Sequence, residues 1–224
     1  MARRGRKVEL KGAIFDLDGV VVDTVPLHFK AWKKMFSEYG REFTFEDYKK
    51  KVDGIPRMDG ARAILNDLSD EELEKAAAKK QKYFLDFLLE EGVRVYKGTL
   101  DLISQLRNKN IKIAVISSSK NCLDILERAE IVNIFDVIIT GNDIKRGKPN
   151  PDIFLMACAR LQLEPSGCIV FEDAYMGVKA AKEGNFKCIG VDRYQDPQRL
   201  SGADLVVSDL SEIDYKKMME LLQR

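Results

Sequence analysis

Two aspartates end an apolar run near the start of the chain, in the sequence Gly12-Ala13-Ile14-Phe15-Asp16-Leu17-Asp18-Gly19. An apolar run that meets a turn signal is typical of a buried strand, which places Asp16 and Asp18 at its carboxyl end. Two carboxylates so close together are costly to bury unless a cation or a proton lies between them. Such a pair can bind Mg²⁺ while one carboxylate acts as a nucleophile and the other carries a proton. The alternative is an exposed Asp-x-Asp turn, because Asp is common where strands end.

A serine-rich turn and a lysine follow two later apolar runs. Hydroxyl and backbone N–H groups at a strand end can bind an anion, but they can equally cap the next helix. Lys148 stands before Pro149 and a helix start at Pro151, where it can either reach a phosphate oxygen or lie in solvent. The residues of the turn that can contact an anion are Ser117, Ser118, Ser119 and Asn121.

Two adjacent acids, Glu172 and Asp173, end a further apolar run. They can complete an oxygen shell around Mg²⁺, or they can be the favourable charges of a helix start, and the two interpretations are compatible. The chain has one histidine, His28, so a zinc site with several imidazoles is excluded. Any bound metal is therefore expected to be a hard cation held by carboxylates.

The elements that position these residues follow an alternating pattern. Short Val/Ile-rich runs separated by helical patterns predict an α/β fold with a doubly wound, Rossmann-like parallel sheet, covered on both faces. Ligands bind such sheets outside the carboxyl ends of the strands, where the polar groups described above fall. After the first strand, the expected strands are 111–116, 135–139, 168–171, 188–191 and 205–207, and the expected helices are 99–108, 122–130, 151–161 and 175–183.

The segment 24–94 breaks the alternation, because it contains no convincing strand. We expect an all-helical cap domain there, inserted after the first strand, with 1–23 and 95–224 forming the α/β core domain. A helical bundle in that position is expected to act as a lid over the acidic strand end. The expected cap helices are 27–39, 45–51, 59–68 and 70–90.

Composition excludes several classes of function. The 224 residues include 37 basic and 36 acidic side chains, so the net charge of +1 provides no field of one sign for binding nucleic acid. No apolar run approaches the roughly 20 residues that span a bilayer, and no apolar segment follows the basic residues 1–7, which we expect to be a short solvated arm. We therefore expect neither a membrane nor a nucleic-acid partner.

The four cysteines, Cys122, Cys158, Cys168 and Cys188, show no C-x-x-C spacing. We expect them to be small buried residues with free thiols, as is usual for a protein of the reducing cytoplasm.

The order of these groups resembles the haloacid dehalogenase-like phosphotransferase superfamily. Asp-x-Asp, Ser, Lys-Pro and Glu-Asp stand at successive strand ends from Lys11 onward, with a helical insert after the first strand. The resemblance implies a mobile cap, a Mg²⁺ cofactor and an aspartyl-phosphate intermediate. It makes Asp16 the nucleophile and Asp18 the acid–base residue.

The same resemblance implies roles for the later motifs. Ser117 and Lys148 would bind the oxygens of the transferring phosphoryl group. Asp16, the backbone carbonyl of Asp18, and Asp173 would ligate Mg²⁺. Glu172 would ligate it as well or orient a metal-bound water.

Cap residues resemble the β-phosphoglucomutase subfamily. Asp23-Thr24-Val25-Pro26-Leu27-His28-Phe29-Lys30-Ala31-Trp32 is similar to its T-x-x-x-H-x-x-A-W cap entry, and Gly54-Ile55-Pro56-Arg57 is similar to its cap loop. The resemblance implies that Gly54 and Arg57 bind the second phosphate of a hexose bisphosphate, with Thr24 and His28 at the hinge. Packing on the helix is the alternative for His28, and a solvent-facing position is the alternative for Arg57.

Other residues of the cap and core leave questions open. Either Lys79 or Lys80 can contribute to the site. Asp53 departs from the subfamily pattern, which more often has a basic or neutral residue at this position. The charge of Asp53 would oppose a nearby phosphate or pair with Arg57. The return to the core, Tyr96-Lys97-Gly98, lacks the usual proline.

Two activities on a small sugar phosphate share this chemistry. The first is a phosphomutase that interconverts β-glucose 1-phosphate and glucose 6-phosphate, and the alternative is a phosphatase of sugar phosphates or other small phosphomonoesters. They differ in how well the closed cap excludes water and in whether it binds a second phosphate. A non-catalytic sugar-phosphate sensor is a minor alternative, and we expect a monomer because a moving lid needs free surface.

Overall fold

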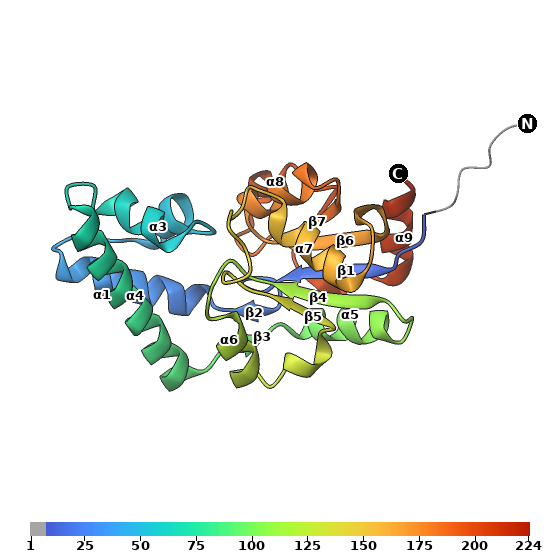
Figure 1. Cartoon of the computed structure of the whole chain (residues 1–224), viewed down its shortest axis with the longest axis horizontal. Helices are drawn as coiled ribbons and strands as arrows, with labels where there is room; N and C mark the ends of the chain where they lie inside the picture. Colours follow the sequence, from blue (N-terminus) through green and yellow to red (C-terminus); the bar gives the residue numbers. More distant parts are fainter. Residues whose placement is uncertain (1–7) are drawn as a thin grey trace, which may run out of the picture. The chain divides into compact units, whose positions relative to one another are not determined.

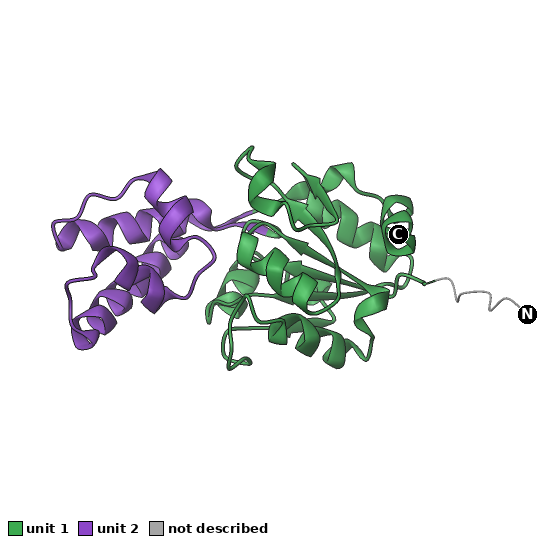
Figure 2. Ribbon diagram, turned by 90° about the horizontal axis from the view of Figure 1, so that it is seen from above, with its two compact units in different colours: residues 1–21, 95–224 green, residues 22–94 purple. Residues whose placement is uncertain are grey.

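The chain forms two compact units, which are residues 1–21 with 95–224 and residues 22–94 (Figure 2). The structure, a computed structural model, describes residues 8–224, so the expected arm at residues 1–7 lies outside the described part. The first unit is an α/β layer structure, and the second is helical apart from its ends.

A parallel six-stranded sheet forms the centre of the first unit, in the order β5-β4-β1-β6-β7-β8 (Figure 1). The expected α/β fold and all six expected strands are confirmed. The chain builds outward from β1 through β4 to β5, and then returns to add β6, β7 and β8 on the other side. The crevice where such a sheet changes direction, here between β1 and β6, is the usual ligand site. The strands are β1 (Gly12–Asp16), β4 (Lys112–Ile116), β5 (Val137–Ile139), β6 (Cys168–Glu172), β7 (Lys187–Val191) and β8 (Leu205–Val207).

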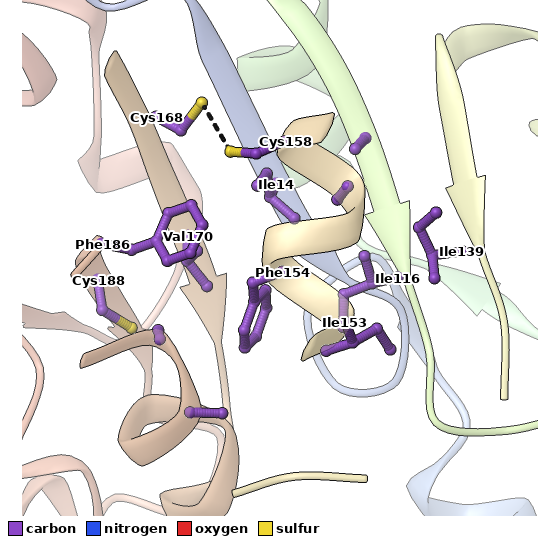
Figure 3. Close-up of a cluster of buried hydrophobic side chains, with 14 of the residues drawn as sticks. Ile14, Ile116, Ile139, Ile153, Phe154, Cys158, Cys168, Val170, Phe186 and Cys188 are labelled. Atoms are coloured by element: carbon purple, nitrogen blue, oxygen red, sulfur yellow. Dashed lines mark hydrogen bonds between the residues drawn. The ribbon is translucent and has the colours of Figure 1, made fainter. Parts of the chain in front are cut away.

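Side chains of the central strands alternate between two buried faces, as expected for a covered parallel sheet. Ile14 and Val170 pack in one core cluster with Phe154, under the helices α7 (Asp152–Leu161) and α8 (Tyr175–Glu183) (Figure 3). Phe15 and Phe171 come next along their strands and stack with ring centroids 4.4 Å apart. Both faces of β1 and β6 are therefore apolar, which leaves only the carboxyl ends of these strands for polar chemistry.

Three further helices complete the first unit. α5 (Lys97–Arg107) contacts β4, and five residues separate the end of that strand from the start of α6 (Cys122–Arg128). α9 (Tyr215–Gln223) was not expected, and an aspartate side chain at Asp214 caps its start by accepting from the N–H of Lys217. None of the helices between residues 8 and 224 is both long and apolar enough to cross a membrane.

The second unit is built on the pairing of α1 (Val25–Glu38) with α4 (Asp70–Glu91). Its core is rich in aromatic side chains, among them Trp32, Phe36 and Phe43. The boundaries of α4 follow from capping, because Ser69 and Glu72 form a reciprocal capping box and Gly92 ends the helix with a positive φ of 69°.

Smaller elements of the second unit differ from expectation. The expected helix 45–51 is a single α turn, α2 (Phe45–Asp47), followed by the π-helical turn Tyr48–Val52. The expected helix 59–68 starts and ends earlier, as α3 (Arg57–Ile64). Two short strands, β2 (Val22–Asp23) and β3 (Arg94–Val95), pair where the chain leaves and rejoins the first unit, and neither was expected, because each has only two residues.

Candidate active site

Strand register gathers the polar motifs of the first unit at one edge of the sheet. Asp16 ends β1 and pairs in register with Ile116 of β4, so Ser117 directly follows at the same level. Glu172 ends β6, the strand on the other side of β1. Because parallel strands end at the same edge, three motifs far apart in sequence meet there.

Lys148 joins this edge from the loop before α7. Its Nζ donates to Asp16 Oδ1 at 2.5 Å and to Glu172 Oε1. The three side chains are almost fully removed from solvent, with 8% of Lys148, 7% of Asp16 and none of Glu172 exposed. This burial excludes the alternative in which Lys148 lies in solvent. A buried charge of this kind is stable only when it is paired, as it is here on both sides.

The charges of this cluster shift the pKa values of its members. Burial is the largest cause of the raised pKa of Asp16, and Lys148 opposes it, while Glu172 and Asp18 raise it further. Burial disfavours the charged form of Lys148, but the two carboxylates outweigh that effect and raise its pKa. The charged form of Lys148 is therefore favoured, whereas the charged form of Asp16 is disfavoured despite its contact with Lys148.

Glu172 is held in a tight space beneath α8. Its Oε2 accepts from the backbone N–H of Ala174 at 2.8 Å, while its Oε1 accepts from Lys148. A Cβ on Gly177 would lie 1.7 Å from Oε1, so only glycine fits at that position of the helix. Gly177 was not among the predicted site residues, although a glycine within a helix is unfavourable and therefore indicates close packing.

Ser117 connects the second motif to the first. Its Oγ donates to Asp18 Oδ2 at 3.0 Å and accepts from the N–H of Ser119 at 3.0 Å. Ser119 in turn accepts from the N–H of Asn121 through its own Oγ, at 3.1 Å. Ser118 is exposed, whereas Ser117 and Asn121 are buried.

The turn leads into a helix, as the capping alternative requires, but its side chains do not cap that helix. Asn121 stands at the N-cap of α6 but makes no side-chain cap bond, and the serine hydroxyls order the turn instead. A turn fixed in this way presents its donors in one arrangement, which suits recognition of an anion.

Gly19 and Asp173 lie against each other. Gly19 adopts a φ of +76°, a conformation that L side chains rarely adopt, and a Cβ there would lie 1.9 Å from Asp173 Oδ2. Asp173 is only 8% exposed. The acid of the fourth motif is thus placed beside the loop that carries Asp18.

The donor set of this edge fits a hard divalent cation. Asp16, Glu172 and Asp173 are three buried acids, and Lys148 is the one cation that the described contacts place among them. Carboxylate and carbonyl oxygens are the ligands that Mg²⁺ prefers. Within residues 8–224 no group of three or more His, Cys, Asp or Glu side chains is already arranged around a metal position. Asp16, Asp173 and the carbonyl of Asp18 could hold Mg²⁺, and Glu172, each of whose oxygens accepts one hydrogen bond, could ligate it as well or orient a metal-bound water.

His28 and Lys80 form a buried pair within the second unit. Lys80 Nζ lies 2.7 Å from His28 Nδ1 and over the ring of Trp32, and only 4% of Lys80 is exposed. The His28 ring stacks on Phe84 with centroids 4.2 Å apart. Which of the two groups donates depends on the tautomer of His28. His28 therefore packs against its neighbours and has a polar partner, and its role at the hinge stays a prediction.

Arg57 is the other cap residue with a defined contact. Its Nη1 donates to Gln81, which is the residue after Lys80 on α4, and burial lowers its pKa. Gly54, in the preceding loop, is exposed and has a positive φ of 72°.

The remaining cap residues are now placed as well. Thr24 is fully buried, and its carbonyl accepts from the N–H of His28 at 2.9 Å. Lys79, the other candidate lysine, pairs with Glu38 at the surface, so Lys80 is the buried one of the two.

A parallel sheet with acids at its carboxyl edge and a helical insert, α1–α4, after β1 and β2 defines a haloacid dehalogenase-like architecture. The chain belongs to this family, whose sequence model, described as haloacid dehalogenase-like hydrolase, matches residues 13–191. It is an enzyme of that family, a phosphomutase or a phosphatase.

Individual relatives include proteins with either activity in their names. The chain is 34% identical to the β-phosphoglucomutase of Bacillus subtilis, over 94% of this chain and 95% of the relative. It is 33% identical to the phosphorylated carbohydrates phosphatase of Thermotoga maritima, over 80% of this chain and 84% of the relative. The crystal structure of a β-phosphoglucomutase from Clostridium difficile has a TM-score of 0.85 at 31% identity, covering 95% and 97% of the two chains.

The space around Glu172 makes a testable prediction. Gly177→Ala should lower the free energy of unfolding by about 1–3 kcal/mol, because the added methyl group forces the buried carboxylate to move. Chemical denaturation measures this change. Gly147→Ala is the matched control, since nothing lies within 4 Å of a Cβ at Gly147. Equal stability of the two variants would contradict the packing of Glu172 against α8.

Proposed function

We propose that the protein is a Mg²⁺-dependent phosphotransferase that acts on a small sugar phosphate through an aspartyl-phosphate at Asp16. Within that class we propose a phosphomutase of β-phosphoglucomutase type. The observation that carries the proposal is the buried Asp16 with Lys148 on one oxygen, next to Asp18 held by Ser117. This arrangement supports one carboxylate as a nucleophile and another as a proton carrier at the same strand end.

In the first step, a carboxylate oxygen of Asp16 attacks phosphorus in line with the leaving oxygen. Lys148 binds oxygens of the transferring group, and its fixed position stabilises their charge without reorganisation. Ser117 can join it by turning its hydroxyl proton from Asp18 to a phosphoryl oxygen. Mg²⁺, when bound, supplies the positive charge that lets ionised Asp16 approach a phosphate dianion. Lys148 also holds Asp16 in one rotamer, so the nucleophile is oriented before substrate arrives.

Asp18 handles the proton. As an acid it protonates the leaving oxygen, and as a base it later takes the proton from the group that attacks the aspartyl-phosphate. The bond from Ser117 Oγ to Asp18 Oδ2 holds that carboxyl group at the strand end where the exchange takes place. The acceptor in the second step is a sugar hydroxyl in a mutase and water in a phosphatase.

The cap supplies the proposed specificity. Arg57 is a bidentate donor suited to the second phosphate of a bisphosphate, and its half-buried position strengthens that interaction. The His28–Lys80 pair places an amine and an imidazole in contact in the same unit. A phosphatase of small phosphomonoesters is the second candidate, and the similarity to the Thermotoga maritima phosphatase supports it.

We further propose that the protein works in the cytoplasm. The four cysteines are free and buried, which supports a protein of the reducing cytoplasm. We retain the expectation of a monomer whose partner is a small phosphorylated molecule.

Separating the products distinguishes the two activities. With β-glucose 1-phosphate, Mg²⁺ and a trace of the 1,6-bisphosphate, glucose 6-phosphate should exceed released phosphate by about tenfold or more, because a mutase cap excludes water. Coupled dehydrogenase and phosphate assays follow the two products side by side. Release of phosphate without glucose 6-phosphate would favour the phosphatase over the mutase. The absence of both products with every phosphomonoester tested would refute the whole proposal.

Asp16→Asn should abolish both activities, with a loss in kcat of about 10⁴-fold or more, because an amide cannot form the aspartyl-phosphate. Steady-state kinetics and intact-mass detection of the phosphorylated enzyme measure this effect. Asp152→Asn is the control, since Asp152 pairs with Arg146 at the surface. Turnover by Asp16→Asn within tenfold of the unchanged enzyme would place the nucleophile elsewhere.

Arg57→Ala should raise KM for the bisphosphate by about 10–100-fold but leave turnover of a small aryl phosphate within about threefold, since an aryl phosphate has no second phosphate. Arg62→Ala is the matched control on the same helix, where Arg62 pairs with Asp70 in solvent. A similar effect on both substrates would remove Arg57 from substrate binding.

A further inference from the structure

Three successive carbonyl groups follow the Asp18 loop, and each accepts a hydrogen bond from elsewhere in the first unit. Gly19 O accepts from Arg193 Nε at 2.7 Å. Val20 O accepts from Thr99 Oγ1 at 2.6 Å, and Val21 O accepts from the N–H of Tyr96 at 3.0 Å. Arg193 is the one charged donor of the three and comes from the loop after β7, 174 residues away from Gly19.

Arg193 is itself held on two sides. Its guanidinium carbon lies 3.6 Å from the centroid of the Tyr96 ring, a close stacked contact. Its Nη1 donates to Ser208 O and to Asp209 Oδ2, both at 3.2 Å. Only 12% of the side chain is exposed. Its Nε and Nη1 are therefore bonded, whereas the buried Nη2 has no hydrogen-bond partner among the described residues. A planar guanidinium stacked on a ring and bonded through two of its nitrogens is a geometry that lysine cannot reproduce.

The carbonyl that Arg193 holds belongs to the residue after Asp18. The turn is closed by a bond from the N–H of Val21 to Leu17 O at 2.9 Å, with Leu17 fully buried. Gly19 at its tip has a φ of +76° and no room for a side chain beside Asp173. Holding the Gly19–Val20 peptide in one plane restricts the backbone of this turn to one conformation. The backbone position from which the Asp18 side chain extends is then fixed as well.

We propose that Arg193 is a positioning residue that sets the direction of the Asp18 carboxyl group by holding Gly19 O. This inference rests on the proposed function, in which Asp18 protonates the leaving oxygen. Arg193 touches neither reacting group in the described contacts, so its effect reaches the chemistry through the Gly19–Val20 peptide. A role in packing alone is the competing explanation.

The dependence on leaving group separates the two explanations. An alkyl phosphate needs its leaving oxygen protonated, whereas 4-nitrophenolate leaves without help. Arg193→Met should therefore lower kcat/KM for a sugar phosphate by about 100-fold and for 4-nitrophenyl phosphate by less than about fivefold. Arg193→Lys should restore little of the loss, because the stacked fork is absent.

Arg199→Met is the matched control, because Arg199 also stacks on a ring, that of Tyr194, at 4.3 Å. It should leave the ratio of the two substrates unchanged. Equal losses on both substrates in Arg193→Met and Arg193→Lys would overturn the proposal in favour of packing.

Hydrogen exchange of the full chain gives a readout that needs no activity. In Arg193→Met the Val21 amide should exchange about tenfold faster or more, whereas Arg199→Met should leave it unchanged. An unchanged Val21 amide would overturn the proposal, whatever the kinetics. If the unaltered enzyme turns over neither substrate, the proposed function fails, and the exchange rates alone decide whether Arg193 holds the turn.

Discussion

The site of this enzyme depends on one buried contact, the lysine that lies between two carboxylates. Lys148 joins the ends of β1 and β6 to the loop before α7 by bonding to Asp16 and Glu172. Without it, two acids would be buried side by side, each at a cost of several kcal/mol. Lys148 therefore offsets the charge of the two buried carboxylates, and it orients the nucleophile at the same time.

Much of the surrounding structure serves to keep that cluster in place. Gly177 leaves room for Glu172, Gly19 leaves room for Asp173, and Ser117 binds Asp18 while its own oxygen orders the next turn. Burial is the largest cause of the raised pKa of Asp16, and the neighbouring acids Glu172 and Asp18 raise it further against the effect of Lys148. An edge that is incompletely neutralised suits a site that receives a divalent cation and a phosphoryl group in turn.

Long, strongly patterned elements were predictable from the sequence, and short ones were not. The six strands and most helices follow from apolar runs and their spacing, because burial on both faces demands such runs. The strands β2 and β3, of two residues each, and the π-helical turn Tyr48–Val52 are too short for such a pattern to identify them. Their form depends on pairing and packing partners distant in sequence, which local propensity does not report.

The sequence by itself determined which residues stand at the carboxyl edge, namely Asp16, Asp18, Ser117 and Glu172-Asp173. It could do so because a parallel sheet brings every strand end to one edge whatever the loops do. Only the tertiary structure decided the contacts made there and in the cap. Lys80 rather than Lys79 meets His28, 52 residues away, because neighbouring positions on a helix face different sides and packing chose which side is buried. The bond between Arg193 and Gly19 is of the same kind, since no local pattern records a partner 174 residues distant.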